Sequence, residues 1–160
     1  MEILKGKNVF LRALEPKDID YLFSTENNEN FWEISNTSQP FSKHTLSKYL
    51  EKSHLDIYQI NQLRLVISDY NNISLGLIDL FDVDFKNLKA GVGILINKTN
   101  RDKGYAKEAL EKLIEYSFKY LNLHQLYCNI IEDNMPSISL FKSLGFKEVG
   151  LKKDWVYFKG

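Results

Sequence analysis

A strand-like segment that runs through a glycine turn into a long helix constrains the fold of this 160-residue chain most strongly. The segment KAGVGILIN (89–97) has the apolar, β-branched composition of a strand, and TNRDKGYAKEAL (99–110) follows it. Beyond Gly104 apolar residues recur at helical spacing, which predicts a helix over 103–121. A strand joined to a helix of this length is typical of an α/β domain.

The other segments predict one domain over residues 1–160, without a linker or an internal repeat. Further strand patterns lie at 8–14, 62–68, 73–81, 124–131 and 146–159, where the last range is expected to hold two strands. Further helix patterns lie at 15–23, 42–58 and 134–146, which makes four helices, and 24–41 is expected to be irregular or a broken helix. The order β-α-α-β-β-β-α-β-α-β-β describes an α/β fold with a mixed sheet.

Charge and cysteine content exclude several classes of function. The 21 basic and 21 acidic residues cancel, which argues against a nucleic-acid or anionic membrane partner. Cys128 is the single cysteine, and the three histidines show no metal-ligand spacing. No apolar run approaches the roughly 18 residues of a membrane span, and the start lacks the apolar core of a signal peptide. We therefore expect a cytoplasmic protein without a metal, a membrane or a nucleic-acid partner.

The residues around Gly104 predict a local anion site. Arg101 and Lys103 place two cations at a helix N-terminus that already carries partial positive charge, and only Asp102 offsets them. This composition favours a bound anion such as a pyrophosphate, which the glycine backbone can approach closely, although an ordinary surface turn is the alternative. The turn lacks the elements of a P-loop and of a G-x-G-x-x-G fingerprint, so ATP, GTP and NAD are poor candidates.

Two motifs of the chain resemble those of the GCN5-related N-acetyltransferases. Arg101-Asp102-Lys103-Gly104-Tyr105-Ala106 is similar to the family's Arg/Gln-x-x-Gly-x-Gly/Ala pyrophosphate loop. DNMPSISLFKSLGF (133–146) is similar to its Asn-x-x-Ala/Ser-Ile-x-Leu-Tyr-x-x-x-Gly-Phe segment. The resemblance is strong over 90–150, and upstream it points to the branch of ribosomal-protein alanine and spermidine acetyltransferases. It implies a single GNAT-like domain whose mostly antiparallel sheet contains a splayed central pair of parallel strands.

The same resemblance implies acetyl-CoA as co-substrate, held between the strands at 90–97 and 125–131. Backbone groups of Ile94, Leu95 and Ile96 would pair with the pantetheine arm, and N–H groups across 101–106 would hold the pyrophosphate. Around the last helix the resemblance implies cofactor contacts from Asn134, Ser137, Phe141 and Lys142. Asn134 is equally suited to be a helix N-cap, so both roles stay open for it.

Two positions that carry catalytic groups in many relatives are changed in this chain. The glutamate that serves them as a base is replaced by Gly91, and the tyrosine that protonates the sulfur is replaced by Phe141. Asp79 is predicted to accept the amine proton or hold the ammonium, unless it is an ordinary surface carboxylate, and Ser137 to position a water near the sulfur. The chain is then either an enzyme that relies on positioning or an acyl-CoA-binding domain without turnover.

Acidic and aromatic side chains are expected to line the acceptor site. The predicted substrate-binding residues are Glu29, Trp32, Glu33, Asp79 and Asp82. Carboxylates and aromatic rings suit a cationic amine. The resemblance to spermidine acetyltransferases, which carry acidic residues at positions that look equivalent to Asp79 and Asp82, implies a small polyamine-like acceptor; a protein N-terminus and an amino sugar remain alternatives. The resemblance also implies a homodimer, in which the strands at 146–159 would pair across a two-fold axis.

Overall fold

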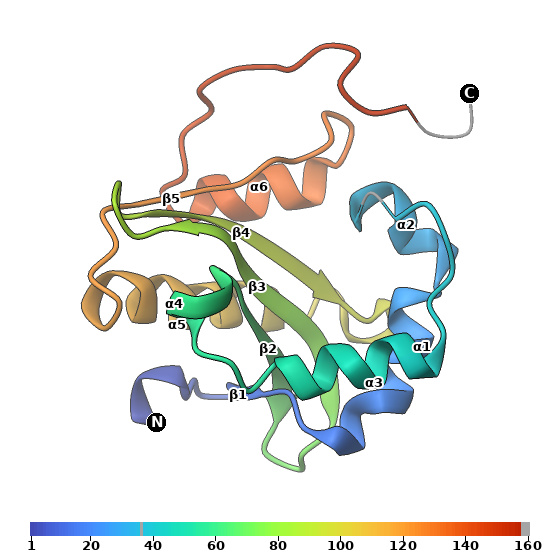
Figure 1. Cartoon of the computed structure of the whole chain (residues 1–160). Helices are drawn as coiled ribbons and strands as arrows, with labels where there is room; N and C mark the ends of the chain where they lie inside the picture. Colours follow the sequence, from blue (N-terminus) through green and yellow to red (C-terminus); the bar gives the residue numbers. More distant parts are fainter. Residues whose placement is uncertain (36, 158–160) are drawn as a thin grey trace.

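The chain folds around a five-stranded sheet with helices on both faces (Figure 1). The computed structural model describes residues 1–35 and 37–157, and of Glu33 and Ile34 only the backbone. The strands, in spatial order, are β1 (Val9–Ala13), β2 (Leu63–Asp69), β3 (Ser74–Asp84), β4 (Lys89–Ile96) and β5 (Gln125–Tyr127). β1 to β4 pair with one another in antiparallel order and β5 pairs in parallel with β4, which confirms the mixed, mostly antiparallel α/β sheet.

Helix α5 (Tyr105–Lys119) covers one face of the sheet. Its inward residues Ala109, Leu110 and Leu113 are fully buried against apolar side chains of the strands, among them Val9 and Ile78. This apolar stripe explains why the helical pattern beyond Gly104 predicts the element correctly. The helix thereby fixes the glycine turn at its N-terminus relative to β4.

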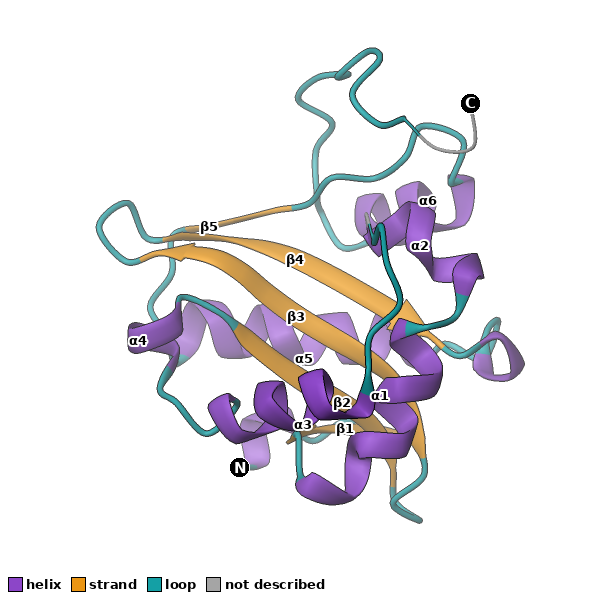
Figure 2. Cartoon of the chain, turned by 45° about the vertical axis from the view of Figure 1, so that its right-hand side comes forward, coloured by secondary structure: helices purple, strands orange, loops and turns teal. Residues whose placement is uncertain are grey.

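The opposite face carries α1 (Ile19–Glu26) and α3 (Lys43–Lys52), as Figure 2 shows. Leu22 and Leu46 from these helices form a second apolar cluster with Val66 and Leu77 of the sheet. The shorter helices α2 (Glu29–Ser35) and α4 (Ile57–Ile60) and the 3-10 turns η1 (Glu2–Leu4), η2 (Pro16–Asp18) and η3 (Lys98–Asn100) complete the connections, and α6 (Met135–Ser143) follows β5.

The described residues thus contain six α-helices rather than the four expected from sequence. The segment 24–41 contains the regular helix α2, and the helix expected over 42–58 is divided in two. The division occurs because Asp56 starts a new helix: its carboxylate accepts the N–H of Tyr58 at 2.8 Å, and the Gln59 side chain accepts the N–H of Asp56.

The chain beyond α6 differs most from expectation. Residues 147–157 form no helix or strand, so the two strands expected over 146–159 are wrong for the described part, and 158–160 lie outside it. Val149 is 99% exposed and Trp155 71%. β5 ends at Tyr127 instead of 131. The pair β4 and β5 consequently lies at the edge of the sheet and not at its centre.

Candidate active site

β4 and β5 pair over a short distance and then separate. Their register runs only from Lys89 opposite Gln125 to Gly91 opposite Tyr127, while β4 continues to Ile96. From residue 92 onward β4 therefore pairs with β3 alone, and its other edge leaves backbone donors and acceptors without a β5 partner. The predicted pantetheine-binding residues Ile94, Leu95 and Ile96 all lie on this part of β4, where an extended ligand can add backbone hydrogen bonds.

The predicted pyrophosphate loop lies immediately beyond this edge. Gly104 is the N-cap of α5 with φ +80°, a left-handed conformation that favours glycine, and an added Cβ would meet no atom within 4 Å. Arg101, Asp102 and Lys103 are exposed beside it, with Tyr105 and Ala106 opening the helix. The arrangement leaves open space in front of a helix N-terminus flanked by two cations, which fits the diphosphate of acetyl-CoA.

The acid in the first turn of α5 is directed away from the loop. The Glu108 carboxylate accepts the backbone N–H of Asn8 at 2.6 Å, that of Val9 at 3.2 Å and the Asn8 side-chain amide at 3.0 Å. Burial opposes its ionisation, but these hydrogen bonds prevail and lower the pKa of Glu108. The carboxylate therefore joins α5 to β1 and does not compete with an anion for the helix N-terminus.

Arg101 connects the loop to the helices on the other face of the sheet. Its guanidinium carbon lies 5.8 Å from the ring centroid of Phe31 in α2, and its Nε donates to the carbonyl of Ile96 at 3.4 Å. Phe31 is buried, so α2 is held next to the loop. The sequence places Phe31 among the aromatic residues of the acceptor wall, but it does not predict the contact with Arg101, which lies 70 positions along the chain.

Helix α6 supplies the remaining predicted cofactor contacts. Asn134 is its N-cap and accepts the N–H of Ser137 at 3.4 Å, which confirms the capping role and leaves the ligand role a prediction. Phe141 is 5% exposed and packs edge-on against Phe146, so its ring belongs to the core. Lys142 is half exposed and pairs with Glu148 at 3.2 Å.

Gly91, the position of the family's glutamate, is closed to any side chain. A Cβ built there would overlap the ring of Phe81 on β3. That ring also packs edge-on against Tyr127, with the two centroids 6.0 Å apart. Phe81 therefore fills the space above Gly91, an aromatic replacement that motif comparison cannot detect because it comes from another strand.

Asp79 is neither free nor an ordinary surface carboxylate. It lies directly opposite Arg64 on β2, and both its oxygens accept from that guanidinium, at 2.6 and 3.1 Å. Arg64 also donates to Glu26 of α1 at 2.6 Å. Burial disfavours the charge of Arg64, yet the contacts with Asp79 raise its pKa and keep it cationic. Because Arg64 donates to both carboxylate oxygens, an amine that meets Asp79 would share the carboxylate with the guanidinium.

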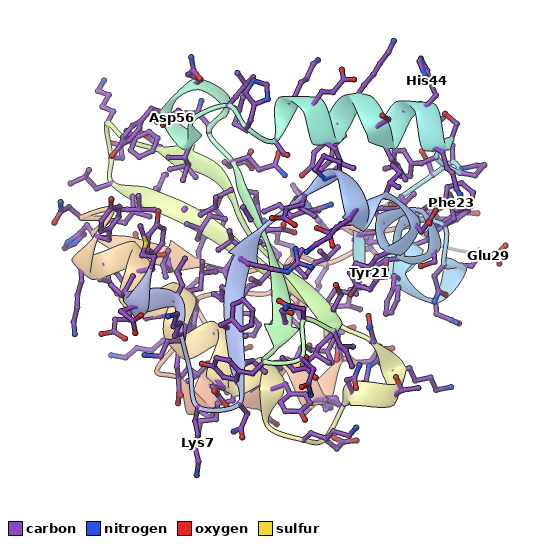
Figure 3. The ribbon with its side chains drawn as sticks, turned by 90° about the horizontal axis from the view of Figure 1, so that it is seen from below. Lys7, Tyr21, Phe23, Glu29, His44 and Asp56 are labelled. Atoms are coloured by element: carbon purple, nitrogen blue, oxygen red, sulfur yellow. The ribbon has the colours of Figure 1, made fainter. Side chains whose placement is uncertain are left out.

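Of the predicted acceptor residues whose side chains the structure describes, Asp79 and Trp32 lie at the Arg64 cluster, whereas Glu29 and Asp82 are exposed on α2 and β3. Trp32 is half buried and donates its indole N–H to the carbonyl of Glu26 at 2.9 Å, beside the ion-paired cluster. Glu29 is exposed and lies at the rim of the molecule (Figure 3). Asp82 is exposed on β3 near Tyr127. The side chain of Glu33 lies outside the described residues.

The fold and the site together define the class of the protein. A mixed sheet that separates between two parallel strands, followed by a basic glycine loop at a helix N-terminus, is the framework of an acyl-CoA-dependent transferase. The chain belongs to the acetyltransferase (GNAT) domain family, whose family model matches residues 8–147. It is an N-acetyltransferase. GNAT acetyltransferases use acetyl-CoA as the acetyl donor.

Named relatives support the same assignment. The spermidine N(1)-acetyltransferase of Vibrio cholerae is 28% identical over 88% of this chain and 79% of its own length. The putative ribosomal N-acetyltransferase YdaF of Bacillus subtilis is 27% identical over 97% of this chain and 86% of its own. A crystal structure of the Vibrio cholerae spermidine enzyme with CoA and spermine superposes with a TM-score of 0.82, at 27% identity over 91% of this chain and 84% of that one.

Two further properties concern the described ranges only. None of the helices there combines the length and the apolar character needed to cross a bilayer. Within the same ranges His, Cys, Asp and Glu side chains do not gather in groups that would hold a metal ion.

Proposed function

We propose that the protein transfers the acetyl group of acetyl-CoA to a primary amine of a small cationic molecule of the polyamine type. The observation that carries the donor side is the cation-flanked loop at Gly104, placed at the end of the unpaired edge of β4. Within this proposal the backbone of Ile94–Ile96 holds the pantetheine arm, and the loop 101–106 holds the diphosphate. Asn134, Ser137, Phe141 and Lys142 complete the donor site from α6.

The acceptor side of the proposal rests on charge and on the relatives. Glu26 and Asp79 carry two negative charges against the single positive charge of Arg64, so the cluster keeps an excess of one negative charge. Glu29 and Asp82 add exposed carboxylates at a greater distance. The Vibrio cholerae relative is named for spermidine and was solved with spermine, which supports an amine of this kind. The attraction is weaker than sequence suggested, because Arg64 neutralises part of it.

A non-catalytic acyl-CoA-binding domain is the second candidate. It is favoured by Gly91 and Phe141, which leave two proton-transfer positions without a titratable group, and by Phe81, which closes one of them. This candidate predicts saturable acetyl-CoA binding without turnover.

A thiol-release assay distinguishes the two candidates. Purified protein is mixed with acetyl-CoA and separately with polyamines, amino sugars and peptides that carry a free N-terminus. We expect CoA release with polyamines; release with peptides alone would replace the polyamine by a protein N-terminus, as the name of the Bacillus subtilis relative suggests. Acetyl-CoA binding without release for every amine would support the non-catalytic domain.

Arg101→Glu tests the donor site through the acetyl-CoA affinity, measured by calorimetry. Replacing the cation by a carboxylate removes a charged contact with the diphosphate and adds repulsion, so acetyl-CoA affinity should fall roughly 10- to 100-fold. Lys98→Glu is the matched control, since Lys98 is an exposed cation of the preceding turn η3 and lies outside the proposed loop. Equal affinities for the Arg101 variant and the wild type in calorimetry would reject the diphosphate site.

We also propose that the protein acts as a homodimer in the cytoplasm. The exposed apolar residues of 147–157 and the open outer edge of β5 support association through this part of the chain. A spermidine N-acetyltransferase structure from Vibrio cholerae is dodecameric, so self-association occurs in a relative of this fold, at a TM-score of 0.81.

A further inference from the structure

Tyr127 lies where β4 and β5 separate. It is the last residue of β5, and its partner in the parallel register is Gly91. Its ring contacts Phe81, which fills the space above Gly91. Tyr127 is therefore a proton-carrying side chain that the strand register places beside Gly91, the position where a glutamate would act in other family members.

Tyr127 lies at the end of the unpaired edge of β4, where a bound acyl chain would place its reactive group. An extended acyl chain lying along residues 92–96 from the glycine loop would run toward the closed end of the split, formed by Gly91 and Tyr127. The nearest predicted base, Asp79, has both oxygens engaged by Arg64. Proton transfer at this end of the chain thus has one half-buried hydroxyl available from β5.

We propose that the hydroxyl of Tyr127 relays a proton from the acceptor nitrogen to the departing sulfur, an inference that rests on the transferase function proposed above. The acceptor reacts as its neutral amine, after its ammonium proton has passed to solvent. The nitrogen forms a C–N bond to the thioester carbonyl carbon, and the C–S bond breaks with its electron pair moving to sulfur. Tyr127 Oη takes the proton that the nitrogen loses while its own proton passes to the sulfur. The products are an amide and the free CoA thiol, and the tyrosine ends unchanged.

The chemistry of the phenol suits a relay better than a base. A tyrosine hydroxyl both donates and accepts a hydrogen bond, which a relay requires. Partial burial and, to a smaller extent, the Asp82 carboxylate raise the pKa of Tyr127. The group therefore keeps its proton at neutral pH, which excludes a standing phenolate base and preserves the proton that the sulfur needs.

Tyr127→Phe tests the relay because it removes the oxygen and keeps the ring that packs on Phe81. We expect kcat with the accepted amine to fall about 100-fold, the range of a lost general acid–base group, while acetyl-CoA affinity and the melting temperature stay at wild-type values. Tyr120→Phe, on the exposed end of α5 and stacked on Tyr116, is the matched control and should keep wild-type kcat.

One more measurement separates catalysis from structure. In wild-type protein with labelled tyrosine rings, the resonance that disappears in Tyr127→Phe should shift when CoA is added. This readout does not depend on turnover.

The outcomes distinguish the relay from the function on which it rests. If Tyr127→Phe keeps the wild-type kcat, or if the Tyr127 resonance does not shift when CoA is added, the relay is wrong. Neither result contradicts the transferase function. Wild-type protein that releases no CoA with any amine removes the proposed function and the relay with it.

Discussion

At the scale of single residues, Gly91 and Phe81 behave as one unit. The side chain missing from β4 is replaced by a ring from β3, so neither residue can change alone without cost. Motif reading identified Gly91 as a departure from the family and treated it as a loss. The structure shows instead a filled space, which means that restoring a glutamate requires the ring to leave first.

Gly91→Ala should therefore destabilise the protein by about 1–3 kcal/mol, the usual cost of overpacking a filled site. Gly93→Ala is the control on the same strand, since an added Cβ there meets its nearest atom at 3.8 Å. Urea unfolding of both variants, of Phe81→Leu, and of Gly91→Ala combined with Phe81→Leu measures the effect. The double variant should be more stable than the sum of the single changes implies; strict additivity would contradict the packing argument.

The Arg64 cluster predicts a second effect at this scale. Arg64→Met removes the fork that serves two partly buried carboxylates, Asp79 and Glu26, and leaves both without their partner. We expect a loss of about 2–3 kcal/mol in the free energy of unfolding. Arg64→Lys keeps the charge but not the bidentate geometry, so its free energy of unfolding should lie between those of the wild type and Arg64→Met. If Arg64→Met unfolds at the wild-type urea concentration, the cluster does not stabilise the junction of α1 with the sheet.

Residue-level prediction from sequence succeeded where the signal is local. The glycine loop and the cap Asn134 are each defined by residues within a few positions of one another, so their types suffice to locate them. The Arg64–Asp79 pair depends on which residues of β2 and β3 face each other. That register is set by packing over whole strands, and no single-residue pattern encodes it.

At the scale of elements, the connection between α5 and β1 carries a pH-dependent contribution. The pKa of Glu108 is lowered from its usual value of 4.5, so the ionised form stabilises the folded state. This contribution is complete above the unfolded-state pKa and is lost as pH falls through the lower folded-state pKa. Glu108→Gln should therefore lower the melting temperature at pH 7, and the difference from wild type should shrink below about pH 4.

Glu111→Gln is the control for this experiment, because Glu111 is exposed on the same helix. Its melting temperature should follow that of the wild type at every pH. A Glu108 variant whose deficit stays constant from pH 7 to about pH 3 would show that the hydrogen bonds to Asn8 and Val9 do not depend on ionisation.

Element prediction failed where the partner of an element decides its existence. Strands β1 to β4 were located to within a few residues, since each is half buried and shows it in its composition. The range 146–159 carries a similar pattern, yet its described part remains without a strand because no neighbouring edge pairs with it. A strand is stabilised by the strand beside it, and composition cannot supply that neighbour.

At the scale of the whole molecule, residues 147–157 expose apolar side chains and the outer edge of β5 lacks a strand partner among the described residues. The segment carries several exposed apolar side chains: Val149, Leu151, Trp155 and Tyr157 are 99, 56, 71 and 87% exposed. In the homodimer proposed above, a second copy would cover this apolar surface and pair with the open edge, with residues 147–157 adding as a strand to the partner's β5.

Val149→Asp combined with Leu151→Asp should therefore convert a dimer into a monomer. Buried carboxylates on the apolar face of an added strand would be strongly unfavourable, whereas in a monomer these positions stay in water. Ile73→Asp is the matched control, since Ile73 is 57% exposed in the turn between β2 and β3, as Leu151 is 56% exposed. Sedimentation velocity at several protein concentrations gives the mass of each form. A wild-type protein that stays monomeric at every concentration would show that residues 147–157 do not associate. The site between β4 and β5 would then act within a single chain.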